Sequence, residues 1–148
     1  MTEPDALHFD DLELGQQLPP VEHEVTQAVI DHAAVAHLDF NPVHTDLDWT
    51  GRAQPFGTPS TVAHGMFTIS VMASVINRAW RRAGASIRTV ESTLTKPVPA
   101  GQTIRAEATI TELHPLGPGR NEVLVRVTAT DDDAERVAVG SFRVHVPD

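Results

Sequence analysis

Residues 62–80 read VAHGMFTISVMASVINRAW, a long and largely apolar stretch of the chain. Its apolar residues recur at a helical spacing and occupy more than one face of the predicted helix: Val62, Met66, Phe67, Ile69, Ala73, Ile76 and Trp80. We therefore predict a long helix from about Val62 to Trp80 that is buried on most sides. A helix of this kind needs a large apolar surface to cover it.

The second half of the chain supplies that surface as strands. Apolar and polar residues alternate over 104–110 and 123–127, which is typical of half-buried strands. Two further strands are predicted over 87–95 and 137–146, and short turns rich in Gly and Pro separate the four. Consecutive strands joined by short turns form an antiparallel meander. The predicted fold class is α+β, a curved antiparallel sheet wrapped around one central helix.

The first half is predicted to hold shorter elements. Phe9–Leu14 and Val21–Val25 are predicted as short extended pieces, and Thr26 as the N-cap of a helix that continues to Leu38. We expect Thr45–Thr61 to be a loop with a short helical turn near Asp46–Arg52. The run Asp131–Asp133 is interpreted as an exposed acidic turn without a function.

Composition limits the function classes. A chain of 148 residues with 41% apolar residues suits one domain, residues 1–148, with a real core. No apolar run approaches the roughly 18 residues of a membrane span, and the N-terminus lacks the basic and apolar regions of a signal peptide. The absence of cysteine excludes disulfides, thiolate metal sites and a cysteine nucleophile, in agreement with a cytoplasmic protein. A net charge of −9 argues against a general nucleic-acid binder.

An acid and an imidazole lie five residues apart in the stretch Asp39-Phe40-Asn41-Pro42-Val43-His44. The residue before a proline is driven out of the helical region, so we expect the chain to leave its helix near Asp39 and double back. That turn allows Asp39 and His44 to face one small volume, where they can hold a water and move its protons. The alternative is that Asp39 caps a turn and His44 packs beneath the loop.

The start of the central helix offers a second chemical feature. A helix N-terminus presents free N–H groups and a favourable dipole, and Gly65 has no side chain to block an approaching oxygen. We therefore predict that the Gly65 N–H donates to an oxyanion; the alternative is that Gly65 only permits close packing. His64 is expected to have a structural role near the helix start.

These residues resemble the MaoC-like family of hot-dog-fold dehydratases, the (R)-specific enoyl-CoA hydratases. Asp39-Phe40-Asn41-Pro42-Val43-His44 is similar to the family's Asp-x-Asn-Pro-aliphatic-His motif, and Ala63-His64-Gly65-Met66 and Lys96-Pro97-Val98-Pro99-Ala100-Gly101-Gln102 extend the likeness over nearly the whole chain. Two departures stand out: His37-Leu38 replaces a small pair before the aspartate, and the Lys-Pro segment is one residue shorter than is common.

The resemblance implies reversible addition of water to a trans-2-enoyl thioester. His44 would act as general base toward the water, Asp39 would orient the water and handle the proton at C2, and Asn41 and Pro42 would fix the turn. The family implies no metal and no cofactor beyond the coenzyme A or phosphopantetheine of the substrate. It also implies at least a homodimer with sheets joined edge to edge.

Three other functions stay open. The same residues would suit a 3-hydroxyacyl-carrier-protein dehydratase, although the acidic charge disfavours an acidic carrier. They would also suit one subunit of a hetero-oligomeric hydratase for bulky acyl chains. A non-catalytic acyl-thioester-binding protein belongs to another class, and the presence of both Asp39 and His44 argues against it.

Several residues are candidates for substrate contact: Met66, Phe67, Arg78, Arg81, Arg82 and Lys96. Met66 and Phe67 are expected primarily to pack in the core, and secondarily to line a tunnel for the acyl chain. The arginine cluster near 78–88 suits either phosphate groups of the substrate or the solvated end of a helix, where cations favour the dipole. The remaining histidines show no ligand spacing, so no metal site is predicted. The lack of an apolar run long enough for a membrane span predicts no membrane partner.

Overall fold

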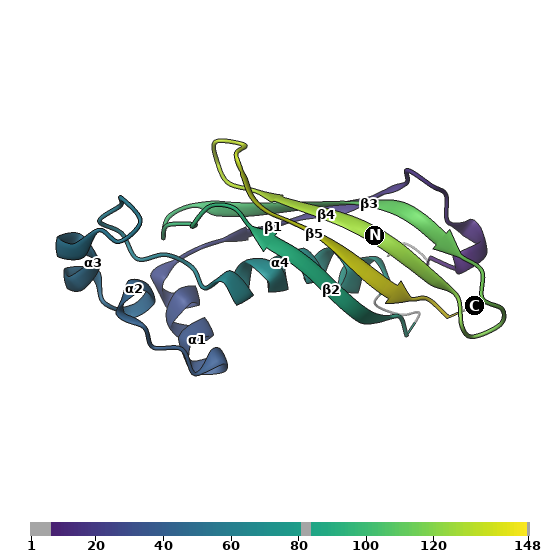
Figure 1. The fold of residues 1–148 in the computed structure, drawn as a ribbon, viewed down its shortest axis with the longest axis horizontal. Helices are drawn as coiled ribbons and strands as arrows, with labels where there is room; N and C mark the ends of the chain where they lie inside the picture. The colour runs from purple at the N-terminus through teal and green to yellow at the C-terminus, as the bar shows by residue number, and fades with distance from the viewer. Residues whose placement is uncertain (1–6, 81–83, 148) are drawn as a thin grey trace, which may run out of the picture.

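The computed structural model describes residues 7–80 and 84–147 (Figure 1). Its elements follow in the order η1 (Phe9–Asp11), β1 (Gln17–Glu24), α1 (Gln27–His37), α2 (Pro42–Thr45), α3 (Leu47–Ala53), α4 (Gly65–Ala79), β2 (Ser86–Leu94), β3 (Thr103–His114), β4 (Glu122–Thr130) and β5 (Arg136–His145). Within the described ranges, no helix is both long enough and apolar enough to cross a membrane.

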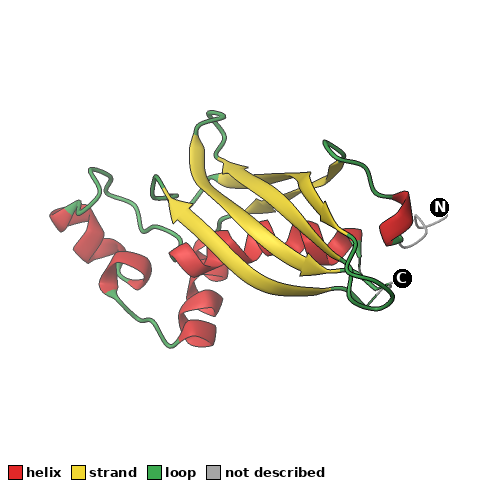
Figure 2. Ribbon diagram, turned by 45° about the vertical axis from the view of Figure 1, so that its right-hand side comes forward, coloured by secondary structure: helices red, strands yellow, loops and turns green. Residues whose placement is uncertain are grey.

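The five strands form one antiparallel sheet in the order β1-β3-β4-β5-β2, which leaves β1 and β2 at its edges. The sheet curves over α4, which runs along one face, while α1, α2 and α3 form a separate lobe beyond the first turn of α4 (Figures 1 and 2). The predicted α+β class and the sheet around a central helix are therefore confirmed.

The core lies between α4 and the sheet. Val71, Met72, Val75 and Ile76 form the buried stripe of α4, at the spacing of one helix face. They join strand residues that are fully buried, among them Ile104, Ile110, Val125, Val127 and Phe142. Met66, Ser70 and Asn77 on the same helix are exposed, so the prediction of burial on most sides is wrong for this single chain.

The prediction of a four-strand meander is also wrong in one respect. β3, β4 and β5 are consecutive neighbours, but β2 pairs with β5 instead of β3. The connection after β2 contains Pro97 and Pro99, which lack the N–H that a sheet interior needs. It crosses the end of the sheet, where Pro99 forms an isolated bridge with Val62.

Two boundaries differ from the prediction. The central helix begins at Gly65, because the Val62 and Ala63 N–H groups donate to the Val43 and Val98 carbonyls and hold residues 62–64 extended. Phe9–Leu14 is not extended but begins with a short 3-10 helix, from which Phe9 is buried in the core. Thr26 caps α1 as predicted, accepting a hydrogen bond from Val29 N.

Candidate active site

The turn between α1 and α2 brings Asp39 back toward the chain that follows it. α1 ends at Leu38 in the left-handed conformation, with φ of 55°, and the Asp39 N–H donates to the Ala34 carbonyl. Asn41 then caps α2, because its Oδ1 accepts from Val43 N at 3.1 Å. Pro42 occupies the first helical position, where its missing N–H costs nothing. The predicted doubling back is present, although a short helix carries His44.

Asp39 and His44 face each other across this turn. Asp39 Oδ2 lies 3.7 Å from His44 Nε2, and the His44 side chain is 13% exposed against 50% for Asp39. His44 Nδ1 lies 2.7 Å from the Val62 carbonyl oxygen, which can only accept, so Nδ1 carries the proton. Nε2 is thus the ring nitrogen that faces the carboxylate. A 3.7 Å separation exceeds a direct hydrogen bond and leaves both atoms within reach of one water oxygen, at about 2.8 Å from each.

The first N–H groups of α4 follow His64, whose ring contacts both members of this pair. His64 is the N-cap of α4 but its side chain makes no capping bond. The N–H groups of Gly65 and Met66 have no acceptor among the residues that the structure describes. An added Cβ on Gly65 would lie 2.3 Å from Leu94 Cδ1, so the Leu94 side chain already fills that position. Gly65 therefore offers an unused donor beneath a half-exposed leucine.

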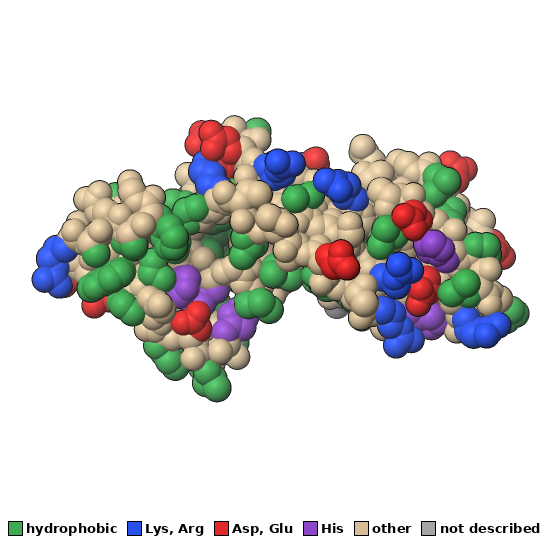
Figure 3. Space-filling view, in the orientation of Figure 1, with side chains coloured by type: hydrophobic (Ala, Val, Ile, Leu, Met, Phe, Trp, Pro, Cys, Tyr) green, Lys and Arg blue, Asp and Glu red, His purple; other side chains and the backbone are tan. Residues whose placement is uncertain are grey.

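His64 contacts both members of the pair. Its side chain is buried, its Nε2 lies 3.0 Å from the Asp39 main-chain oxygen, and its ring stacks on the His44 ring at 3.8 Å. The ring of His37 meets His64 edge-on at 5.5 Å. Figure 3 shows histidine side chains among hydrophobic ones on the lobe that α1, α2 and α3 form.

The acid and the two histidines also resemble a ligand set for a metal ion. One ligand atom from each of Asp39, His44 and His64 lies within 4.8 Å of the others. Imidazole lone pairs lie in the ring plane, however, and the two rings are stacked with only 25° between their planes. Lone pairs in two nearly parallel planes do not converge on one ion. The arrangement suits proton transfer better than a centre that uses both histidines.

Gln27 is a site residue that the sequence did not reveal. Its Nε2 donates to the His44 main-chain carbonyl at 3.0 Å, and its Oε1 accepts from the Thr61 hydroxyl. Gln27 thereby ties the start of α1 to α2 and to the segment that leads into α4. Nothing in the sequence distinguishes it from an ordinary polar residue in the first turn of a helix.

The predicted substrate-contact residues are spread along the molecule. Met66 is exposed beside Gly65, and Phe67 is half-buried with its ring edge-on to His23 at 5.4 Å. Arg78 lies 13 residues after Gly65 on the same helix, about 20 Å away, so the structure does not bring it to the pair. Arg81 and Arg82 lie outside the described residues.

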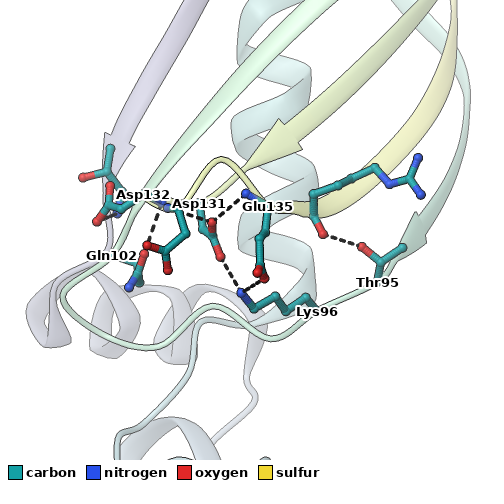
Figure 4. Close-up of polar contacts among 9 residues, drawn as sticks. Thr95, Lys96, Gln102, Asp131, Asp132 and Glu135 are labelled. Atoms are coloured by element: carbon teal, nitrogen blue, oxygen red, sulfur yellow. Dashed lines mark hydrogen bonds and ion pairs between the residues drawn. The ribbon is translucent and has the colours of Figure 1, made fainter.

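Lys96 has carboxylate partners within the protein. Its Nζ donates to Asp131 Oδ2 at 2.8 Å and also to Glu135. These two bonds join the end of β2 to the β4–β5 turn (Figure 4). The hydrogen bonds that Lys96 donates to these two carboxylates raise its pKa above the usual range. Thr95 reinforces the junction, since its Oγ1 donates to the Arg136 carbonyl. The primary role visible for Lys96 is structural.

Asp131 corrects the interpretation of the acidic turn. Asp132 and Asp133 are exposed as predicted, but the Asp131 side chain is 5% exposed. Burial raises the pKa of this carboxyl, but hydrogen bonds from Lys96 and from the Glu135 and Asp133 N–H groups outweigh it, so the pKa is lowered. Asp131 is therefore a buried structural acid.

Comparison with known families settles the relationship of the chain. The family described as MaoC like domain matches residues 12–133, which is most of the sequence. The chain belongs to the MaoC-like dehydratase family. A search of curated protein sequences found no match.

Solved structures of the family share its fold. The R-hydratase PhaJ1 from Pseudomonas aeruginosa superposes with a TM-score of 0.85 at 21% identity, covering 95% of this chain and 86% of that one. The (R)-hydratase from A. caviae involved in PHA biosynthesis superposes with a TM-score of 0.80 at 21% identity, covering 92% of this chain and 98% of that one. The HadBC (3R-hydroxyacyl-ACP dehydratase) complex from Mycobacterium tuberculosis superposes with a TM-score of 0.69 at 20% identity, covering 88% of this chain and 96% of that one. At these identities the likeness establishes the hot-dog fold, as the sequence predicted.

Proposed function

We propose that this MaoC-like protein catalyses the reversible hydration of a trans-2-enoyl thioester to a (3R)-3-hydroxyacyl thioester. The observation that carries the proposal is the approach of Asp39 Oδ2 to Nε2 of His44 at 3.7 Å, with Nδ1 of the same ring held by the Val62 carbonyl. The (R) configuration follows the two R-hydratases that the chain resembles in fold. No metal or redox cofactor is required, because the chemistry consists of proton transfers and one transient negative charge on oxygen.

In the proposed mechanism, His44 Nε2 takes a proton from the water as its oxygen bonds to C3. Asp39 orients that water, and the proton taken up by the Asp39–His44 pair is passed on to C2, so that one water supplies both the hydroxyl at C3 and the hydrogen at C2. Negative charge then collects on the thioester oxygen, where the Gly65 N–H is the donor. One such donor contributes about 2.7–4 kcal/mol to transition-state stabilisation in enzymes that use it. Because hydroxyl and proton come from the same side, the addition is syn.

The thioester carrier is proposed to be coenzyme A. A net charge of −9 is unfavourable for docking an acidic carrier protein. The alternative, a carrier-protein dehydratase, is supported by the fold likeness to the HadBC complex. Comparing turnover of one acyl group on coenzyme A and on a carrier protein separates the two.

We propose that the working enzyme is a homodimer or a larger assembly, or else pairs with a second hot-dog subunit, as in the HadBC complex. Two features support an assembly. The edge strand β2 is paired on one side alone and carries half-exposed apolar residues, Val90 and Leu94. On the site lobe, five large apolar side chains are more than half exposed: Val35, Leu38, Phe40, Leu47 and Phe56. A partner that covers them would also exclude water from the site.

The first experiment is to mix the purified protein with crotonyl-CoA, follow the loss of the enoyl-thioester absorbance and determine the chirality of the product. (3R)-hydroxybutyryl-CoA supports the proposal, and the (3S) product contradicts it. Asp39→Asn and His44→Ala should each lose most activity while remaining folded. His145→Ala is the matched control, because that ring bonds the Gly119 carbonyl on the sheet and should leave turnover intact. Full activity in either site variant would defeat the mechanism.

A non-catalytic acyl-thioester-binding protein remains the rival from another class. It predicts saturable binding of acyl-CoA with no turnover of short, long or bulky enoyl thioesters. The same outcome in the presence of a second hot-dog subunit would favour binding over catalysis.

A further inference from the structure

We propose that His64 is a positioning residue for the Asp39–His44 pair, acting through one hydrogen bond and one ring stack. The inference rests on the proposed hydratase function and assigns His64 a role beyond starting α4. Three observations carry it: the bond to the Asp39 carbonyl, the stack on His44, and a buried ring nitrogen without a hydrogen-bond partner in the described part of the chain.

The hydrogen bond fixes both the tautomer of His64 and the path of the main chain. The Asp39 carbonyl oxygen lies 3.0 Å from His64 Nε2 and can only accept, so Nε2 carries the proton. The bond links the first residue of the turn to a side chain 25 positions later. It therefore holds the Asp39 backbone, and with it the exposed carboxylate, against the start of α4.

The same tautomer leaves Nδ1 as a bare acceptor. That atom is buried and has no hydrogen-bond partner among the residues that the structure describes. A buried polar atom without a partner is destabilising, and in native structures it calls for an explanation. Phenylalanine would fill the same space without that cost. A buried polar group that lowers stability is a feature expected at functional sites, and it therefore points to a function for the ring.

The stack on His44 supplies that function. The two rings lie 3.8 Å apart with 25° between their planes, so His64 covers one face of the proposed base. When His44 accepts a proton from water it becomes a cation on the face of a neutral aromatic ring, which is an attractive arrangement. The attraction is absent before proton transfer and present during it, so it favours the transition state. The stack also limits rotation of His44, whose Nδ1–H is already held by the Val62 carbonyl.

Two substitutions separate the two contacts. His64→Phe keeps an aromatic face for His44 but cannot donate to Asp39, whereas His64→Gln keeps a donor near Nε2 but removes the ring. With crotonyl-CoA, we expect kcat to fall about tenfold to a hundredfold in His64→Phe, because small displacements of catalytic groups are costly. In His64→Gln, loss of the ring should lower kcat about threefold to thirtyfold. KM should change little in both, since His64 is buried and does not meet the substrate.

Stability distinguishes positioning from a merely structural role. We expect His64→Phe to melt close to the wild-type temperature, because removal of the unpartnered Nδ1 offsets loss of the hydrogen bond to the carbonyl of the exposed Asp39. A variant that is as stable as the wild type but slower supports the proposal. His37→Gln is the control, because His37 touches the edge of His64 but has no contact with Asp39 or His44 in the described structure. It should leave kcat within about twofold.

A measurement that needs no turnover keeps this inference separate from the proposed reaction. Long-range ¹⁵N–¹H spectra of the wild-type rings should show His44 protonated at Nδ1 and His64 at Nε2. In His64→Gln, His44 should show a mixture of tautomers or a shifted ring signal. Wild-type kcat in both variants, or an unchanged His44 spectrum in both, would overturn the proposal. If the wild type turns over no thioester, the hydratase function fails and the spectra alone decide the role of His64.

Discussion

Replacing Gly65 with alanine tests the oxyanion donor without removing its N–H. The new methyl carbon would lie 2.3 Å from Leu94 Cδ1, where ordinary contact begins at 3.4 Å. Leu94 is half exposed on an edge strand, so its side chain can turn toward solvent at a cost of about 1 kcal/mol for lost burial. Alanine regains up to about 1 kcal/mol of helix propensity over glycine. We therefore expect the melting temperature of Gly65→Ala to stay within about 4 °C of wild type.

Activity should respond far more strongly than stability. The methyl group shares a Cα with the donor nitrogen, so it crowds the approach of a thioester oxygen to that N–H. If the contact is lost completely, kcat falls by about 10²–10³-fold, the effect of removing one oxyanion donor. The assay is kcat and KM with crotonyl-CoA, alongside thermal unfolding of the same preparations.

Leu94→Ala separates the added methyl from the displaced leucine. The double variant Gly65→Ala/Leu94→Ala removes the clash. Its free energy of unfolding should therefore exceed the value expected from adding the two single effects by up to about 1 kcal/mol. Its activity should stay as low as that of Gly65→Ala, because the methyl remains. Restored activity in the double variant would mean that Leu94 displacement caused the loss. Wild-type activity in Gly65→Ala would refute Gly65 as the donor.

Three further variants probe the scaffold. Asn41→Ala removes the cap of α2 and should lower both kcat and, by about 1 kcal/mol, the free energy of unfolding. Thr26→Ala removes the cap of α1 and should lower the free energy of unfolding by a similar amount with kcat unchanged. Denaturant unfolding and turnover measure the two effects. Equal kcat in the two would contradict a link between the Asn41 cap and His44. Asp131→Asn should lower the free energy of unfolding by about 1 kcal/mol at pH 7. The pKa of Asp131 is lowered in the folded state, so its contribution is present above the unfolded value near 3.9 and is lost as pH falls through the folded value. Urea titrations should thus show the free energies of unfolding of wild type and Asp131→Asn converging below about pH 4. A difference in free energy that stays constant to pH 2 would exclude ionisation of Asp131 as its source.

Local signals in the sequence predicted much of the molecule. Alternation of apolar residues predicted β3 and β4, and the Asn41-Pro42 dipeptide predicted the turn that brings Asp39 to His44. Partners that are remote in sequence were not predictable in this way. The choice of β5 as neighbour for β2 depends on a crossing connection, and the extended start before Gly65 depends on carbonyls of Val43 and Val98. Periodicity within one segment contains no information on either.

The same distinction separates the reacting groups from the contacts that orient them. Asp39, His44 and Gly65 lie in short motifs, but each is held by a residue from elsewhere in the chain. The Val62 carbonyl sets the tautomer of His44, and Leu94 fills the side-chain position of Gly65. Leu94 is in turn fixed at its backbone, since the next two residues bond to the Arg136–Val137 carbonyls and to Asp131. The β4–β5 turn is therefore connected to the Gly65 N–H, the proposed oxyanion donor, through three short steps, and a defect in the Lys96–Asp131 junction should reach the site by displacing Leu94.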